Sequence, residues 1–368
     1  MRALRGLCEL GLHAEVLVPA VLEALHQVVP SSRNLYNWTD EQGRLVRYFI
    51  EGPVDAAVAQ LYFDEFHNRR EADAMPAFHT LSRTPAGIRS AAALEHADFY
   101  RSALYNDIWR PQGMHTRLEA VLRGRRGQLL GSLVLYRAPG DARFTADDER
   151  RLAAAMPPFA TALDACGCAV AQDRHVRSPA PPETLLLTLD GHIERASDGA
   201  LRLLLLADGG VSREALSRPP LALAGQLLPM LLRLLQERAG RGAAAWLDPP
   251  PSITHENGFG QFVASGQLLR AWQGPAGVAP QLAQITLTRL EPHRVALERA
   301  LRALPITPGQ MAVCRELYRG ALHSDIAQRL GVAPATVIDH VRKLYNTLDL
   351  RSALELRALV DQRIACVA

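Results

Sequence analysis

The stretch that most constrains this 368-residue chain is segment 307–354, in which helix signals alternate with glycines placed to stop a helix. Thr307 stands as an N-cap, a proline follows at the first helical position, and Gln310 completes the pattern of a capping box. Gly320 follows the first apolar stripe and is expected to end that helix. Gly331 begins a three-residue turn before the next helical stretch. The segment therefore predicts three short helices separated by tight turns.

The second and third of these helices are expected to pack together through one apolar face each. In the second helix, the residues predicted to face inward are Ile326, Ala327 and Leu330. In the third helix, apolar residues recur at the spacing of a buried face: Val337, Val341, Leu344 and Leu348. The opposite face is polar and carries Asp339, Arg342, Lys343 and Asn346. This pattern describes a helix-turn-helix, whose second helix can enter the major groove of DNA.

This segment resembles the LuxR/GerE-type helix-turn-helix over about 60 residues without a gap. The residues that carry the resemblance are Thr307, Pro308, Val313, Gly320, Ile326, Ala327, Leu330, Gly331, Thr336, Val337, His340, Arg342, Leu348, Arg351 and Ser352. The resemblance implies an all-α, four-helix domain over 305–368 whose partner is double-stranded DNA. It implies DNA contacts from His323, Ser324, Thr336, Ile338, Asp339, His340, Arg342, Lys343, Asn346 and Arg351. The competing interpretation is a helical hairpin of an unrelated all-helical protein.

Three positions depart from the family's usual pattern. Ile338 stands where the family usually has a lysine, and the next residue, Asp339, is an acid facing a polyanion. Isoleucine can pack on a thymine methyl group and aspartate can accept from a cytosine amino group, but Asp339 is equally expected to be solvated or paired within the protein. Ala333 replaces a common capping serine, so the third helix lacks a side-chain cap. DNA binding with an atypical sequence preference is therefore predicted.

The charge balance limits how this domain can bind. The net charge of the chain is only +3, and segment 307–368 has eight basic against six acidic residues, a net of +2. Because phosphate contacts supply much of the affinity, specific binding is expected to require a homodimer on two half-sites. We expect no signal peptide and no membrane partner, since no apolar run reaches spanning length, and we therefore predict a cytoplasmic protein.

Residue counts exclude several classes of function. Lysine occurs once, at Lys343, so neither a P-loop ATPase nor a receiver domain with an active-site lysine is available. The five cysteines and twelve histidines show no zinc, redox-pair or metalloprotease spacing, and no nucleophile–base motif is present. We therefore expect no metal, no cofactor and no enzymatic activity. An enzyme with an appended regulatory tail is the alternative from another class, and a thiol sensor is a further one.

Residues 1–171 are predicted to form a sensor-type α/β domain. Expected helices are 14–28, 55–67, 98–107 and a long one that Thr145 caps; expected strands are 33–38, 44–51, 116–123 and 128–137. This order, with Gly131-Ser132-Leu133 and then Phe144-Thr145 before the last helix, resembles a GAF-like domain. The resemblance implies a small organic effector bound between the sheet and its covering helices.

Most of the chain's aromatic residues lie in this first domain, although aromatic residues are only 6% of the chain. The candidate ligand-binding residues are Tyr36, Trp38, Tyr48, Tyr105, Trp109, Met114 and His115. Segment 109–115 lies just before the hairpin, where the mouth of a pocket is expected. The alternative for each single aromatic residue is that it fills the core or an interface.

A proline-rich linker at 172–183 separates a second domain over 184–291. Expected strands are 184–190, 193–197, 243–247, 260–264, 267–272 and 282–290; expected helices are 198–206 and 219–237. Strand, Asp-Gly turn, strand and helix resemble the opening of a PAS domain. We expect this domain to be a relay or dimerisation module rather than a second sensor.

A linker helix is predicted over 292–304. Leu297, Leu301 and Leu304 form a narrow apolar stripe that fits pairing with a symmetry mate or, equally, packing on the chain's own PAS-like sheet. The last predicted helix, 353–364, offers Leu356, Leu359 and Val360, and the family resemblance implies a dimer contact there.

The sequence thus predicts a multidomain α+β chain with GAF-like and PAS-like antiparallel-sheet domains before a LuxR-type helix-turn-helix. The predicted function is a dimeric bacterial transcriptional regulator modulated by a small molecule bound in the first domain. A regulator controlled by protein assembly without a ligand remains an alternative. A third is an acyl-homoserine-lactone receptor, although about 300 residues precede the helix-turn-helix and that family's pocket pattern is not matched.

Overall fold

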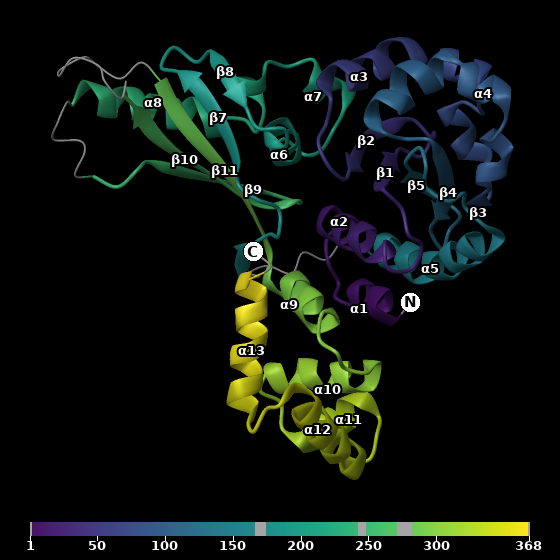
Figure 1. Ribbon diagram of the computed structural model, residues 1–368, viewed down its shortest axis with the longest axis vertical. Coiled ribbons are helices and arrows are strands. Elements are labelled where there is room, and N and C mark those ends of the chain that lie inside the picture. Colours follow the sequence, from purple (N-terminus) through teal and green to yellow (C-terminus); the bar gives the residue numbers. More distant parts are fainter. Residues whose placement is uncertain (1, 166–173, 242–247, 271–281, 367–368) are drawn as a thin grey trace.

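The structure, a computed structural model, describes residues 2–165, 174–241, 248–270 and 282–366. Two lobes, each built on an antiparallel sheet, lie side by side, and a helical lobe extends from their junction (Figure 1). The multidomain fold of two antiparallel-sheet domains followed by helices is the one that the sequence predicts. None of the described helices is both long and apolar enough to cross a membrane.

The first sheet has the strand order β2-β1-β5-β4-β3, and all its neighbours are antiparallel. Its strands are β1 (Arg33–Thr39), β2 (Leu45–Ile50), β3 (Gly87–Arg89), β4 (Thr116–Arg123) and β5 (Leu129–Arg137). One face is covered by α1 (Arg2–Cys8), α2 (Ala14–Leu25) and α5 (Ala146–Asp164). The other face is covered by α3 (Ala56–Leu61), α4 (Ala97–Arg101) and the turns next to them. The sheet therefore has a helical layer on both sides.

Most predicted elements of this domain are present, and the differences are local. The threonine cap of α5 is a full capping box, because Asp148 reaches back to the backbone of Thr145 at 2.9 Å. The predicted helix 55–67 is α3 followed by a π-helical turn, Tyr62–Phe66, and helix 98–107 is α4 followed by another, Leu104–Trp109. The short edge strand β3 was not predicted.

The second sheet has the order β8-β7-β11-β10-β9, and β6 also pairs with β11. Its strands are β6 (His175–Arg177), β7 (Glu183–Thr188), β8 (Ile193–Ala196), β9 (Ser252–Asn257), β10 (Gly260–Leu269) and β11 (Leu282–Pro292). Its helices are α6 (Ala200–Ala207), α7 (Arg213–Leu216) and α8 (Leu227–Gly240). The predicted linker thus contains a strand, β6, which joins the sheet at the base of β11.

One prediction for this sheet is wrong, and one of its strands was not predicted. The predicted strands 260–264 and 267–272 are one strand, β10, because Gly266 is not a turn residue. A Cβ at Gly266 would lie 2.7 Å from a methyl carbon of Leu235, so the glycine lets α8 approach the sheet closely. Strand β9 occupies a stretch to which no element was assigned. The predicted strand 243–247 lies outside the described residues.

The two sheet domains share one hydrophobic core. Phe259 is fully buried, and its ring centroid lies 5.9 Å from that of Trp38 and 6.4 Å from that of Phe49. A two-way backbone bridge joins the domains, with N–H···O distances of 2.8 and 3.1 Å between Tyr48 and Val211. This contact fixes the edge of the first sheet against the second domain.

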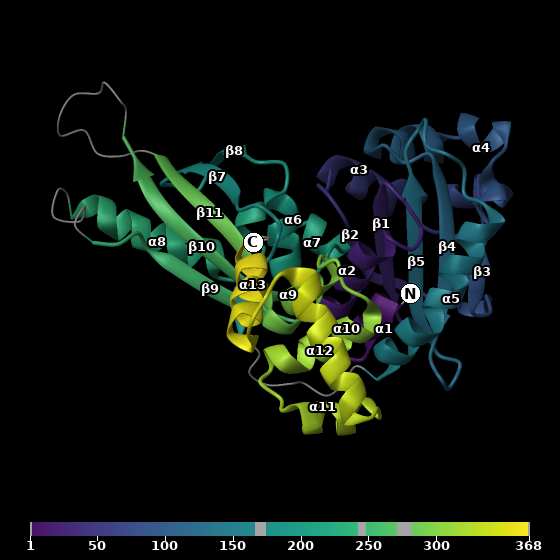
Figure 2. The same cartoon turned by 60° about the horizontal axis from the view of Figure 1, so that its bottom comes forward.

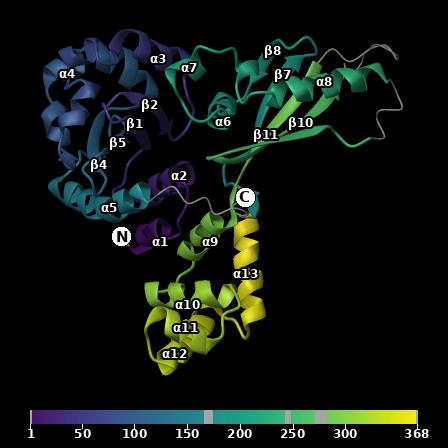
Figure 3. The same cartoon turned by 180° about the vertical axis from the view of Figure 1, so that it is seen from behind.

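The helical lobe begins with α9 (His293–Arg302), which follows β11 without a break. It continues with α10 (Pro308–Tyr318), α11 (His323–Leu330), α12 (Pro334–Leu348) and α13 (Ala353–Cys366). The apolar stripe of α9 is buried in the core of this lobe together with residues of α10 and α13. Figures 1 and 3 show α13 running beside α9, with α10 below them. Both partners predicted for Leu297, Leu301 and Leu304 are therefore wrong, because α13 returns along α9 and covers its apolar face.

The local signals of the helix-turn-helix are found as predicted. The capping box closes with N–H···O distances of 2.7 and 3.4 Å between Thr307 and Gln310. Gly331 ends α11 in the left-handed region at φ 63°, and Ala333 gives α12 no side-chain cap. Leu330 is 37% exposed, so its predicted inward orientation is wrong. It lies at the end of α11, where the chain turns away from the core.

Candidate nucleic-acid interface and sensor cavity

The surface formed by α11 and α12 is the candidate DNA interface. It lies at the far end of the helical lobe, away from both sheets (Figure 1), and Figure 2 brings it forward. Of the predicted contact residues, the exposed ones are His323, Ser324, Thr336, Ile338, Arg342, Lys343, Asn346 and Arg351. Asp339 and His340 are half-buried. Their common placement follows from α12, whose inner face is held by the buried residues Val337, Val341 and Leu344.

Asp339 forms ion pairs with the two basic residues of α12. Its carboxylate lies 2.8 Å from Arg342 and 2.7 Å from Lys343, at i+3 and i+4 on the helix. The hydrogen bond from Lys343 lowers the pKa of Asp339, with Arg342 acting in the same direction. Of the two roles open from the sequence, the structure thus shows the intramolecular pair. The aspartate offsets much of the positive charge that this helix presents.

His340 lies at the edge of the interface rather than within it. Its ring faces the start of α10, where a Cβ at Gly309 would lie 3.1 Å from Cε1 of the histidine. Its Nδ1 is buried and has no hydrogen-bond partner among the described residues. The histidine therefore packs α12 against the N-terminus of α10.

Exposed apolar side chains border the same surface. Leu322 is 68% exposed, Ile338 56% and Val332 38%. Leu322 and Val332 were not among the predicted contact residues, because the prediction for this surface followed the family pattern. Side chains of this kind suit contact with thymine methyl groups and sugars in a groove.

A cavity of about 90 Å³ lies in the first domain between the sheet and the helical layer of α3. Its walls include residues of β1, β2, β4 and β5, the two π-helical turns and the loop after them. Three predicted ligand-binding residues line it: Tyr48, Trp109 and Met114. The cavity is thus at the place where the sequence predicts an effector site.

The other four predicted residues are not in this cavity. Tyr36 and Trp38 point to the opposite face of the sheet, because neighbouring residues of a strand alternate and Leu35 and Asn37 take the cavity side. The Tyr36 ring lies 5.9 Å from that of Phe159 in α5, and the Trp38 ring packs on the second domain.

Tyr105 and His115 form a separate aromatic cluster. The Tyr105 hydroxyl lies 2.7 Å from Nδ1 of His115, and the His115 ring stacks on that of Tyr100 at 4.7 Å. This cluster holds the chain at the start of β4 and does not reach the cavity.

The polar groups of the cavity were not predicted. Arg117 and Glu119 on β4 line it, with their charged atoms 3.3 Å apart, and the Arg117 guanidinium lies 5.7 Å from the centre of the Trp109 ring. Arg89 also pairs with Glu119 at 2.9 Å. Burial raises the pKa of Tyr136, which shares this wall, to about 12, so its hydroxyl stays neutral. The sequence did contain a signal for these polar groups, because two charged residues that stand two positions apart on a buried strand point to the same face of the sheet.

This arrangement combines apolar and aromatic walls with a few convergent polar groups, which is typical of small-molecule sites. Asn37 of the cavity lining is already bonded to the Ser132 hydroxyl at 3.0 Å. The Arg117 guanidinium is therefore the group best suited to fix the orientation of a polar ligand. No group of three or more histidine, cysteine or acidic residues able to hold a metal occurs among the residues that the structure describes.

No protein-family model matches the chain, and no curated protein matches it in sequence. Among solved structures, the VqmA dimer of Vibrio cholerae, described as a LuxR-type receptor, covers 50% of this chain and 83% of its own at 16% identity, with a TM-score of 0.19. A VqmA–ligand–DNA complex covers 51% and 85% at 17% identity, with a TM-score of 0.22. The E. coli DhaR(N)–DhaL complex covers 78% and 86% at 14% identity, with a TM-score of 0.24. These likenesses are too weak to assign a family or a function to the chain.

Proposed function

We propose that the chain is a DNA-binding transcriptional regulator of the LuxR type, with α12 as the helix that enters the major groove. The observation that supports this most strongly is the amphipathic division of α12. Its apolar residues are buried in the helical core, while Thr336, Arg342 and Asn346 are exposed at the free end of the molecule. A helix that packs through one face and leaves its other face exposed can lie in the major groove of DNA.

Sequence preference in this proposal depends on contacts other than a guanine-reading lysine. Ile338 is exposed at the position that faces the groove and fits a thymine methyl group. Arg342 and Lys343 are exposed and can bind DNA phosphates. To do so, they must give up their ion pairs with Asp339. Weak binding to random DNA is the expected result.

Regulation by a small organic effector in the first domain is the second part of the proposal. The cavity that Tyr48, Trp109 and Arg117 line supports it. Its signal would reach the DNA-binding lobe through α9, because Arg299 of α9 bonds Glu23 of α2 at 2.7 and 2.8 Å. An effector changes DNA affinity only by its differential affinity for the two arrangements of these lobes.

The regulator is proposed to act as a homodimer in the cytoplasm, where bacterial DNA lies. The net charge of +2 in segment 307–368 favours two half-sites over one. Since the α9 stripe is buried, we place the pairing surface of this lobe on the outer side of α13, where Leu354 is 76% exposed. Leu356 and Val360, which the sequence analysis placed at a dimer contact, are fully buried within the chain.

The second candidate is a regulator assembled by protein contacts without a ligand. The small volume of the cavity, about 90 Å³, favours it, since a drug-sized molecule does not fit without expansion. Both candidates predict DNA binding. They differ in whether the purified chain responds to small metabolites.

The test is selection of duplexes from a random library, followed by fluorescence anisotropy with the selected duplex. Arg342→Ala is expected to weaken binding at least about tenfold and to reduce the slope of log affinity against log salt by about one. Arg233→Ala, at an 80% exposed site in α8, is the matched control and should bind like the native chain. Failure to enrich any duplex, or equal binding by the Arg342 variant, would refute the assignment.

A further inference from the structure

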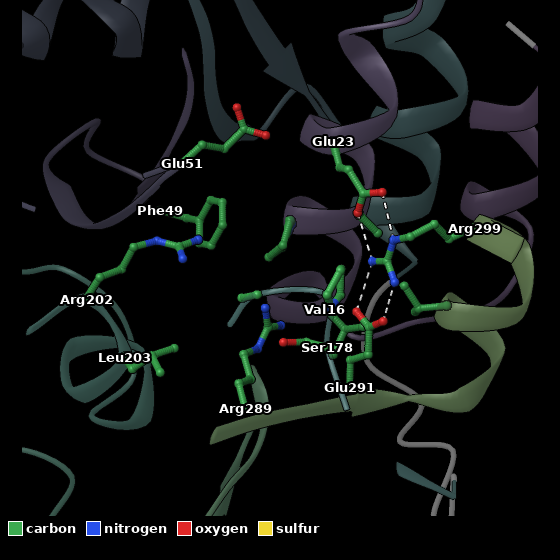
Figure 4. Close-up of a pocket in the computed structure, with 15 residues that line it drawn as sticks. Val16, Glu23, Phe49, Glu51, Ser178, Arg202, Leu203, Arg289, Glu291 and Arg299 are labelled. Atoms are coloured by element: carbon green, nitrogen blue, oxygen red, sulfur yellow. Dashed lines mark hydrogen bonds and ion pairs between the residues drawn. The ribbon is translucent and has the colours of Figure 1, made fainter. Parts of the chain in front are cut away.

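We propose that a second cavity, between the two sheet domains, is a binding site for a small oxyanion, a carboxylate or a phosphate, which Arg202 and Arg289 hold (Figure 4). This site is distinct from the cavity of the first domain. Binding there does not depend on the proposed function of the chain; only its regulatory consequence does.

The cavity lies where three parts of the molecule meet, and its volume is about 130 Å³. Helix α2 and the end of β2 form one wall, α6 and β11 form another, and segment 178–180 and α9 close it. Phe49 supplies an apolar surface, over which the Arg202 guanidinium lies at 5.0 Å from the ring centre. The space suits a small ligand rather than a nucleotide.

The three carboxylates around this cavity are already engaged. Glu51 accepts from His26 at 2.8 Å and from the backbone N–H of Asn34 at 2.9 Å, and in Figure 4 its carboxylate points away from the cavity. Glu23 and Glu291 both accept from Arg299, and the dashed lines in Figure 4 show this bridge. These acids therefore leave two guanidiniums of the lining without a carboxylate.

Arg202 and Arg289 are these two guanidiniums. Arg202 donates from Nε to the carbonyl of Ile50 at 3.0 Å, and Arg289 donates to the carbonyl of Phe259 at 3.0 and 2.8 Å. Within the described parts of the chain, neither has a carboxylate at ion-pair distance. Since a guanidinium has five N–H donors, most of the Arg202 donors and several of the Arg289 donors have no acceptor among the residues that the structure describes.

The electrostatics of the pair favour an anion between them. Burial, and then the charge of Arg289, lowers the pKa of Arg202 to about 10. The pKa of Arg289 is also lowered, chiefly by burial. Both guanidiniums are half-buried. A half-buried cation without a carboxylate at ion-pair distance is destabilising, and an anion between the two would offset that cost.

A buried hydroxyl supplies the independent observation. Ser178 is only 4% exposed, and its Oγ has no hydrogen-bond partner among the described residues. Figure 4 shows this oxygen directed into the space beside Arg289. Buried hydroxyls are normally satisfied, so an acceptor for this one is expected in the cavity. Planar guanidiniums bind carboxylates and phosphates through paired N–H···O bonds, which identifies the ligand as an oxyanion.

The position of the site connects it to the DNA-binding lobe. Val295 and Arg299 of α9 line the cavity, and the residues between and after them, Ala296, Leu297, Ala300 and Leu301, belong to the core of the helical lobe. An anion would contact α6 and β11 on one side and the end of α9 through its neighbours on the other. Its occupancy would therefore stabilise one arrangement of α9 relative to both sheet domains.

The test is thermal unfolding of the full chain in increasing sodium phosphate and, separately, sodium succinate, with sodium chloride at matched ionic strength as the reference. A saturable rise in Tm with phosphate alone identifies a phosphate group, and a rise with succinate alone identifies a carboxylate. Arg202→Met should weaken the response at least about tenfold in midpoint concentration, because one fork of the site is lost. Arg233→Met, at the exposed α8 site, is the matched control.

Stability without the anion separates a ligand site from a structural arginine. Because Arg202→Met removes a half-buried charge that lacks a carboxylate at ion-pair distance, the Tm of the ligand-free variant should equal or exceed that of the native chain. Ser178→Ala, a small change, should weaken the anion response without lowering the Tm. The absence of a saturable rise with either anion, or an unchanged response in both variants, would overturn the proposal. DNA takes no part in this assay, so its failure is distinguishable from failure of the proposed function.

Discussion

Replacing Arg299 with methionine should destabilise the junction between the sheet domains and α9. This arginine bridges Glu23 of α2 and Glu291 at the end of β11, and its side chain is only 13% exposed. It thereby joins the first domain, the second domain and the helix that leads to the helical lobe. Methionine fills a similar volume but leaves Glu291 without its cation and Glu23 with only the longer contact to Arg302, at 3.7 Å.

The size of the effect follows from how deeply each carboxylate lies. The Glu291 side chain is 5% exposed, and removing one partner of such a buried pair costs about 3 kcal/mol. The Glu23 side chain is 40% exposed, so solvent screens it and its loss adds only about 0.5 kcal/mol. We therefore expect a loss of roughly 3–4 kcal/mol in the free energy of unfolding.

Urea unfolding followed by circular dichroism measures this loss as a shift of the transition midpoint. Arg233→Met, which breaks an exposed pair with Glu237, should change the free energy of unfolding by less than about 0.5 kcal/mol. Adding Glu291→Gln to the Arg299 variant should recover part of the loss, because the uncompensated charge is then gone. A loss below about 1 kcal/mol in the Arg299 variant would refute this reasoning.

Three further predictions concern single side chains. Asp339→Asn should tighten binding to random duplex DNA severalfold, since it frees two cations on α12. Fluorescence anisotropy at two salt concentrations measures this affinity, and weaker or unchanged binding would contradict the prediction. Leu301→Ala should lower the free energy of unfolding in urea by about 2–5 kcal/mol, because this residue of α9 is fully buried. A loss as small as that of an exposed residue would contradict this packing. The His26 hydrogen bond with Glu51 raises the pKa of the histidine above its ordinary 6.5, so its stabilisation is present below that pH and is lost as pH rises through the folded pKa. Urea midpoints at several pH values should therefore fall less steeply in His26→Gln, and identical pH profiles would exclude this role.

Local chemistry allowed the helix-turn-helix to be predicted closely. Thr307 and Gln310 form the expected capping box, and Gly331 adopts the left-handed conformation that ends α11. These signals act over a few residues, so no knowledge of distant packing is needed. The same holds for the capping box at Thr145 in the first domain.

Long-range packing explains what the sequence left undetermined. The stripe of α9 has the spacing of a buried face, but the spacing does not say whether a symmetry mate, a sheet or α13 covers it. The cavity residues show a different failure. The candidate ligand-binding residues were selected because most of them are aromatic, and this selection put Tyr36 in the same site as Tyr48. Strand alternation already assigned Leu35 and Asn37 to the face opposite Tyr36. Applying that alternation to β4 would also have identified Arg117 and Glu119.

If α9 links the proposed anion site to the proposed DNA interface, the two binding events must obey reciprocal linkage. An anion that changes DNA affinity by a given factor requires DNA to change anion affinity by the same factor. The geometry makes such coupling expected, because Arg299 lines the anion cavity and the apolar face of α9 belongs to the core of the helical lobe. The first experiment measures the midpoint phosphate concentration in thermal unfolding with and without the selected duplex. The second measures the affinity for the duplex with and without phosphate at constant ionic strength. The two ratios should therefore be equal. If the duplex does not change the phosphate midpoint and phosphate does not change the affinity for the duplex, the anion stabilises the chain but does not regulate DNA binding. Helix α9 would then be a rigid connector.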